Sequence, residues 1–160
     1  MRRFAAMVLT VMITWAMTSC AEKTATPVTA GFACEVDVVY DEATYSGTLQ
    51  VHDDGAIAFV LREPATVAGL TLAFSNEQLT MSLGGIELSL SDAQVPAGAV
   101  VRLLSKALEQ VSASPSCDMQ GELSGAAYTL RFDKESGWPM ALEMPSYALS
   151  LTFSAWQSIE

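Results

Sequence analysis

The sequence predicts a mainly β domain: a strongly curved antiparallel sheet of about ten strands, an open half-barrel, with one amphipathic helix on its concave face. Apolar residues recur with a period of two from Gly31 onward, and residues typical of tight turns separate these short segments. Only one segment after the apolar N-terminus, at about residues 97–112, has the period of an amphipathic helix. Because a long sheet twists and curls, we expect this helix to fill part of its concavity.

The chain begins with the features of an export signal. Met1-Arg2-Arg3 is basic, and the fourteen residues from Phe4 to Met17 are uncharged and mostly apolar. This run is too short to cross a bilayer as a stable helix and is typical of a signal-peptide core. It ends in Met17-Thr18-Ser19-Cys20, which resembles the lipobox of bacterial lipoproteins and implies cleavage before Cys20 and lipid attachment to it. The alternatives are an ordinary secretory leader with an incidental cysteine, or an uncleaved anchor.

This interpretation divides the chain into three parts. Residues 1–19 are the signal peptide, residues 20–30 are the lipidated Cys20 with a flexible tether, and residues 31–160 are the β domain. The tether is small, polar and contains Pro27, so we expect little order there. The predicted location is extracytoplasmic, with the protein anchored by lipid to the outer face of a cell membrane, or to the outer membrane of a cell that has two.

The charge of the mature chain limits its partners. It has six Lys and Arg against eighteen Asp and Glu, a net charge of −12. This negative excess argues against binding to nucleic acid and to anionic lipid headgroups, which are both polyanions.

The expected strands are short and are separated by turn signals such as Asp53-Asp54-Gly55 and Gly84-Gly85. A single antiparallel meander is the simplest topology for them. In Ala56–Arg62 the side chains on both faces of the expected strand are apolar, which predicts a strand that is covered on both sides. The strands are expected at Phe32–Tyr40, Tyr45–His52, Ala56–Arg62, Leu70–Ser75, Leu79–Leu83, Ile86–Leu90, Met119–Leu123, Ala127–Asp133, Met140–Met144 and Tyr147–Trp156.

The helix lies between the sixth and seventh of these strands. Pro96 suits its first turn, where the missing N–H costs nothing. Val101 is expected to fall outside the apolar stripe. The stripe itself consists of Val100, Leu103, Leu104, Ala107, Leu108 and Val111.

The sequence offers little for catalysis. His52, the only histidine, stands beside two aspartates at a hairpin tip, where we expect a solvated turn. There is no G-x-S-x-G elbow, Gly-rich phosphate loop, Cys-x-x-Cys pair or calcium-loop spacing. The prediction is therefore a protein that is not an enzyme, with no metal site and no cofactor.

Two cysteines remain after Cys20. Cys34 and Cys117 form an even pair in an exported chain, which predicts a disulfide. Two buried free thiols are the alternative.

Aromatic, methionine and leucine side chains on the strands and the helix allow two interpretations. They line a pocket for a lipid or another hydrophobic ligand, or they are ordinary core. The pocket interpretation selects Leu49, Phe59, Leu72, Phe74, Met81, Leu104, Trp138 and Met140.

Three short phrases add a family resemblance. They are Tyr45-Ser46-Gly47-Thr48-Leu49, Gly55-Ala56-Ile57-Ala58-Phe59 leading to Arg62-Glu63-Pro64, and Gly137-Trp138-Pro139. With the lipobox, the curved sheet and the helical insertion, they resemble the LolA/LolB superfamily, which includes RseB and the mycobacterial LppX/LprG lipoproteins. The long N-terminal helix of that family has no counterpart here, and Glu63 stands where the family's carrier has an arginine before the proline.

The resemblance implies an unclosed barrel whose apolar cavity carries lipoproteins or glycolipids, or senses the state of the envelope. We therefore expect a membrane-anchored, non-catalytic lipoprotein that binds a lipid or acyl chain in the concave face of its sheet. The alternative is a protein-interaction or envelope-stress sensor module with a fully packed core and an envelope protein as its partner.

Overall fold

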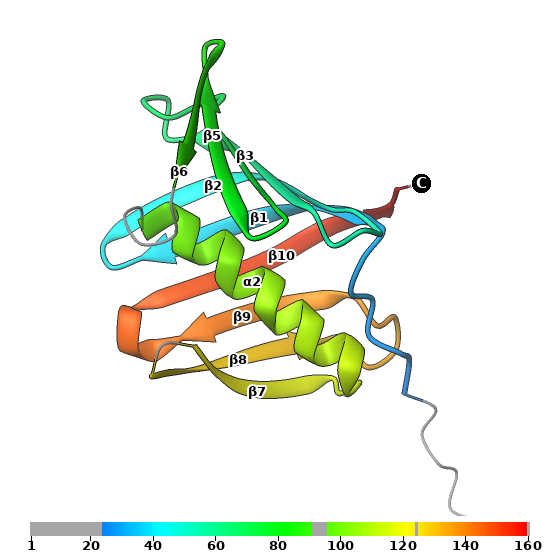
Figure 1. Ribbon diagram of the computed structural model, residues 1–160. Coiled ribbons are helices and arrows are strands. Elements are labelled where there is room, and N and C mark those ends of the chain that lie inside the picture. Colours follow the sequence, from blue (N-terminus) through cyan, green and yellow to red (C-terminus); the bar gives the residue numbers. More distant parts are fainter. Residues whose placement is uncertain (1–23, 91–95, 124, 160) are drawn as a thin grey trace, which may run out of the picture.

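The computed structural model describes residues 24–90, 96–123 and 125–159. Within these ranges ten antiparallel strands form one curved, unclosed sheet, and the helix α2 (Pro96–Ala113) lies across its concave face (Figure 1). The predicted fold class is confirmed. The strands are β1 (Phe32–Tyr40), β2 (Ala43–Val51), β3 (Ile57–Glu63), β4 (Thr71–Ser75), β5 (Gln78–Leu83), β6 (Ile86–Leu90), β7 (Asp118–Leu123), β8 (Ala126–Phe132), β9 (Pro139–Met144) and β10 (Leu149–Ser158), with a short 3₁₀ turn, η1 (Pro145–Tyr147), before β10.

The strand order corrects the expected single meander. The order across the sheet is β6-β5-β4-β3-β2-β1-β10-β9-β8-β7, so the first and last strands pair at its centre. Two meanders, β1 to β6 and β7 to β10, extend outward from this pair. As a result, β6 and β7 are the two edges of the sheet, and α2, which lies between them along the chain, runs across the concave face from β3 and β4 to β7.

The helix buries a wider stripe than its sequence indicated. The six predicted stripe residues are at most 8% exposed, and Val101, which was expected outside the stripe, is only 1% exposed. A helix turns about 100° per residue, so Val101 lies only about 20° from Leu108 around the axis. A concave sheet wraps around a helix and therefore covers more of its circumference than a flat sheet would.

The sheet is covered on one face only along β3. Ile57, Phe59 and Leu61 point inward and are buried, whereas Val60 is 36% exposed on the other face. The prediction that this strand is covered on both sides was wrong. Val60 on an interior strand therefore faces solvent, as isolated apolar side chains commonly do.

Gly47 lets β2 and β3 approach closely. A Cβ at this position would lie 2.3 Å from the carbonyl oxygen of Val60 and 2.9 Å from the ring of Phe59. The register between the two strands also shifts between Ser46 and Gly47, as expected at a bulge that bends a sheet. The glycine in the Tyr45-Ser46-Gly47 phrase therefore serves the curvature that brings the concave face around α2.

Candidate ligand-binding surface

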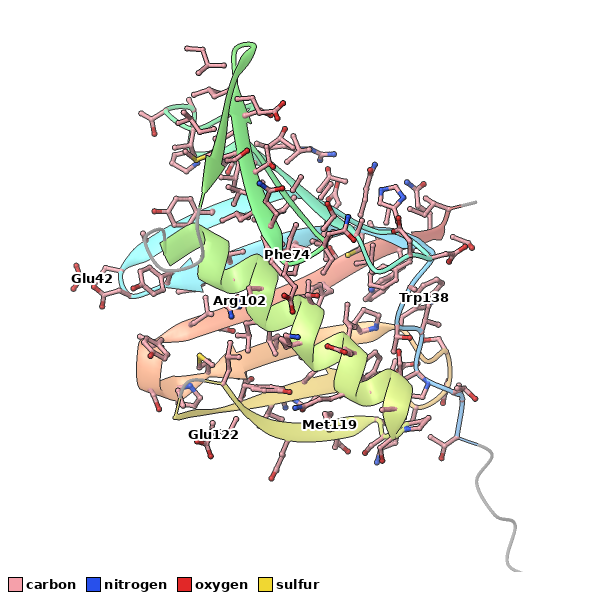
Figure 2. All side chains as sticks on the ribbon, in the orientation of Figure 1. Glu42, Phe74, Arg102, Met119, Glu122 and Trp138 are labelled. Carbon is pink, nitrogen blue, oxygen red and sulfur yellow. The ribbon has the colours of Figure 1, made fainter. Side chains whose placement is uncertain are left out.

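Most of the predicted pocket residues form a closed core. Leu49, Phe59, Leu72 and Leu104 are between 1% and 5% exposed, and Phe74 is 6% exposed. All five belong to one hydrophobic cluster that joins α2 to both halves of the sheet. Phe74 lies beside the helix (Figure 2). So little of their surface is accessible that the space between α2 and the central strands is packed by side chains.

Met140 does not line the concave face. Its side chain is 46% exposed, although Leu142 and Met144 on the same strand are buried. The register between β8 and β9 shifts at this point: Arg131 pairs with Ala141, but Phe132 pairs with Pro139. The extra residue reverses the alternation of side chains, so Met140 points outward. A strict period of two could not show this.

Trp138 lies at the margin of the core. It is half-buried, and its ring packs edge-on against Phe32 with 5.9 Å between the ring centroids. The neighbouring Trp156 donates a hydrogen bond from its indole Nε1 to the carbonyl oxygen of Pro139, at 2.9 Å. Trp138 therefore supports one end of the sheet, on the side where residues 24–30 run (Figure 2).

The concave face continues beyond the helix on the β5–β6 hairpin. Leu79 is buried in the core, and the alternation along β5 places Met81 and Leu83 on the same face. The strand register sets Leu88 opposite Met81 and Ile86 opposite Leu83. We call Met81, Leu83, Ile86 and Leu88 the β5–β6 strip. Figure 1 shows this hairpin projecting away from the rest of the sheet.

The β5–β6 strip is apolar and open to solvent. Leu83 is 46% exposed, Leu88 51% and Ile86 70%, while Met81 is half-buried against the core. Contiguous exposed apolar side chains mark binding surfaces more often than isolated ones do. The sequence analysis selected only Met81 from this set. The alternation and the Gly84-Gly85 turn did indicate a common face, but only the path of α2 shows which part of that face stays uncovered.

A polar groove of about 530 Å³ is lined by the turn between β2 and β3, the turn between β4 and β5, and α2. Its lining includes the apolar residues Ile57 and Leu108. It also includes the acidic residues Asp53, Asp54, Glu77 and Glu109, and Lys106 pairs with Glu109 at 3.3 Å. Of the eight predicted ligand-binding residues, only Phe74 lines this groove. The groove therefore does not represent the predicted apolar pocket.

The hairpin tip at His52 is a solvated turn, as predicted. His52, Asp53 and Asp54 are exposed, and a carboxylate oxygen of Asp54 accepts a 2.9 Å hydrogen bond from the backbone N–H of Ala56. Among the described residues no three His, Cys, Asp or Glu side chains are grouped so as to hold a metal ion. In the same part of the chain, no helix has the length and apolar character needed to cross a membrane.

The predicted disulfide is not formed in the structure. Cys34 and Cys117 are both free thiols. Cys34 is buried on β1, and Cys117 directly precedes β7, which three strands separate from β1 in the sheet. Neighbouring strands lie about 4.8 Å apart, and a disulfide needs its two Cα atoms within about 7 Å. Two cysteines at strands that are separated by three others do not meet this requirement. Burial raises the pKa of the Cys34 thiol to about 12.

Residues 24–30, which belong to the predicted tether, contact the β domain. The backbone N–H of Ala25 donates to the carbonyl oxygen of Lys134 at 2.8 Å, and that of Val28 donates to Gly137 at 2.7 Å. Val28 and Ala30 pack against the core. Cys20 and the predicted signal peptide lie outside the described residues.

Comparisons with known proteins bear on the fold. No protein-family model and no curated protein matches the sequence. A LolA superfamily protein from Nitrosomonas europaea aligns with a TM-score of 0.43 at 10% identity, covering 82% of this chain and 87% of its own. An uncharacterised conserved protein from Thermus thermophilus aligns with a TM-score of 0.51 at 10% identity, covering 83% of this chain and 81% of its own.

The likeness is one of fold. The structure itself has the unclosed antiparallel sheet with a helix across its concave face that the sequence predicted. At 10% identity no residue's role passes from either structure to this chain.

Proposed function

We propose that this protein is an extracytoplasmic lipoprotein, anchored to a membrane through lipid on Cys20, that binds a lipid or another hydrophobic ligand without catalysing a reaction. The observation that carries the ligand-binding part is the β5–β6 strip. It continues the concave apolar face beyond α2 and leaves three large apolar side chains between 46% and 70% exposed.

The energetics favour an apolar ligand on this surface. Complete burial of a leucine or isoleucine side chain contributes about 1.5–3 kcal/mol. Leu83, Ile86 and Leu88 each retain about half or more of their exposure, so a ligand that covers all three gains about 3 kcal/mol from them. Half-buried Met81 connects the strip to the core, and its flexible thioether adapts to irregular apolar shapes.

A dye-binding assay tests the ligand site. An apolar fluorescent dye should bind saturably to the purified protein, and solvent extraction of natively purified protein should release lipid. Ile86→Ser combined with Leu88→Ser should weaken dye binding about tenfold, which corresponds to about 1.4 kcal/mol. The matched control is Val39→Ser with Met140→Ser, which removes two apolar side chains that are 43% and 46% exposed outside the strip. Equal affinity of the two double variants, or no saturable binding and no extracted lipid, would contradict the proposal.

The lipid anchor is supported by the sequence from Met1 to Cys20. The basic start, the uncharged apolar run and the cysteine at its polar boundary match the requirements for export followed by lipidation. Several acyl chains, at about 0.8 kcal/mol per buried CH₂, hold a protein on a membrane stably. Mass spectrometry of the mature N-terminal peptide should find acyl chains on Cys20, and Cys20→Ser should release the protein from membranes. An unmodified Cys20 in the mature protein would refute the anchor.

The packed interior favours a second candidate function, a protein-interaction or envelope-sensing module. Leu49, Leu72 and Leu104 leave almost no accessible surface between α2 and the sheet. The edge strand β6 has unpaired backbone groups along one side and could take an extended peptide as an added strand. Recovery of an envelope protein by crosslinking through β6, with no lipid in the extract, would favour this candidate over ligand binding.

A further inference from the structure

We propose that residues 24–30 form a strap that holds one end of the domain against the membrane and keeps the β5–β6 strip on the side away from it. This inference rests on the proposed lipidation of Cys20 and adds the orientation of the domain on the bilayer. In this arrangement the surface of the membrane lies against the strap end of the domain. The strap end is formed by the loop of residues 133–137, between β8 and β9, and by the C-terminal end of α2.

Backbone hydrogen bonds hold the strap along the β8–β9 loop. The N–H groups of Ala25 and Val28 donate to the carbonyl oxygens of Lys134 and Gly137, at 2.8 and 2.7 Å. The thiol of Cys117 contacts the carbonyl oxygen of Ala25 at 3.8 Å. Two contacts three residues apart fix the direction of the strap as well as its position.

The strap also covers surface that would otherwise face solvent. Gly137 is buried, and a Cβ at this residue would lie 2.2 Å from the carbonyl oxygen of Thr26. The hydroxyl of Ser112, near the end of α2, donates to the hydroxyl of Thr29 at 2.8 Å. Val28 and Ala30 join the hydrophobic core. A freely moving linker would make none of these contacts.

Chain length then sets the distance from the bilayer. Cys20 and Thr24 are separated by four residue steps, which span at most about 14 Å even when fully extended. If the segment up to Gly31 were free, eleven steps would allow about 40 Å. The docked strap therefore keeps the β8–β9 loop close to the headgroups.

The β5–β6 hairpin lies at the far end of the molecule from the strap, as Figure 1 shows. With the strap docked, the strip faces the aqueous side of the envelope. A ligand on the strip is therefore exchanged with that side, and lipids of the anchoring bilayer reach the strip only after the strap is released.

The chain supplies its own probes of this arrangement. The signal segment contains Trp15, and the other two tryptophans of the sequence are Trp138 and Trp156. Trp138 follows Gly137, and Trp156 hydrogen-bonds to Pro139, so both mark the strap end. Energy transfer from them to a dansyl group on a lipid headgroup falls steeply with distance and therefore measures how far this end stands from the membrane.

The experiment uses the mature lipidated protein, which begins at Cys20 and therefore lacks Trp15, in phosphatidylcholine vesicles that contain dansyl-phosphatidylethanolamine. Ala25→Pro with Val28→Pro removes both strap N–H donors, and Ala25→Ser with Val28→Thr is the matched control that keeps them. We expect energy transfer in the proline variant to fall at least twofold, while the control stays at the native level. Equal transfer in all three proteins, each floating with the vesicles, would overturn the strap.

Hydrogen exchange separates this inference from the lipid anchor. The amides of Ala25 and Val28 should exchange slowly in the mature protein whether or not Cys20 carries lipid. Rapid exchange at both amides would refute the strap directly. If both amides are protected but the native protein does not float with the vesicles, the lipid anchor is refuted. The membrane orientation is then refuted with it, and only the docking of the strap on the domain stands.

Discussion

Shortening one leucine in α2 should destabilise the domain much more than shortening one on the β5–β6 strip. Leu104 is 1% exposed in the middle of the helix stripe, whereas Leu88 is 51% exposed on the hairpin. Leu→Ala in a closed core costs about 2–5 kcal/mol, because the transfer energy is lost and a cavity remains. For Leu104→Ala we expect about 3 kcal/mol, and for Leu88→Ala at most about 0.5 kcal/mol.

Thermal unfolding followed by circular dichroism measures this difference. A free energy of 1 kcal/mol shifts the Tm of a domain of this size by about 3–5 °C. The Tm should therefore fall by about 10–15 °C for Leu104→Ala and by about 2 °C or less for Leu88→Ala. Leu104→Asp should unfold the domain, because its carboxylate would be buried without a partner. Similar shifts for the two alanine variants would mean that α2 does not dock where the structure places it.

Four further predictions concern single sites. A thiol reagent at pH 8 should modify half-buried Cys117 quickly and Cys34 only after unfolding; equal rates in the folded protein would contradict the burial of Cys34. Because the folded protein retains the Cys34 proton up to a pKa of about 12, stability should fall as pH rises from 9 toward 12, and Cys34→Ala should reduce this fall; an unchanged pH profile would refute it. Gly47→Ala should cost about 1–3 kcal/mol in urea unfolding, because its Cβ would lie 2.3 Å from a backbone oxygen, and a neutral effect would show that β2 and β3 lie further apart. The carboxylate of Asp133 accepts hydrogen bonds from Ser136, which hold its pKa below the usual value; NMR titration of Ser136→Ala should find a higher pKa, and an unchanged one would exclude that cause.

The strap and the β5–β6 strip lie at opposite ends of the domain. Ala25 and Val28 tie the chain to the β8–β9 loop at one end, and the exposed leucines and isoleucine lie at the other. Between them the core holds α2 in place across the sheet. The proposed ligand site and the proposed anchor therefore lie at opposite ends of the domain, so under these two proposals a ligand on the strip and the bilayer do not compete for the same surface.

The sequence alone determined the elements and the fold class, because side-chain alternation and helical periodicity are local properties of the chain. It predicted the helix stripe around Leu104, since burial of an apolar face requires that spacing wherever the helix packs. The tertiary structure decided the strand order, the outward turn of Met140, the docking of residues 24–30 and the exposure of the β5–β6 strip. Each of these depends on which segments meet in space. Pairing β1 with β10 sends α2 across the sheet, and the length of the helix then fixes how much of the concave face it covers.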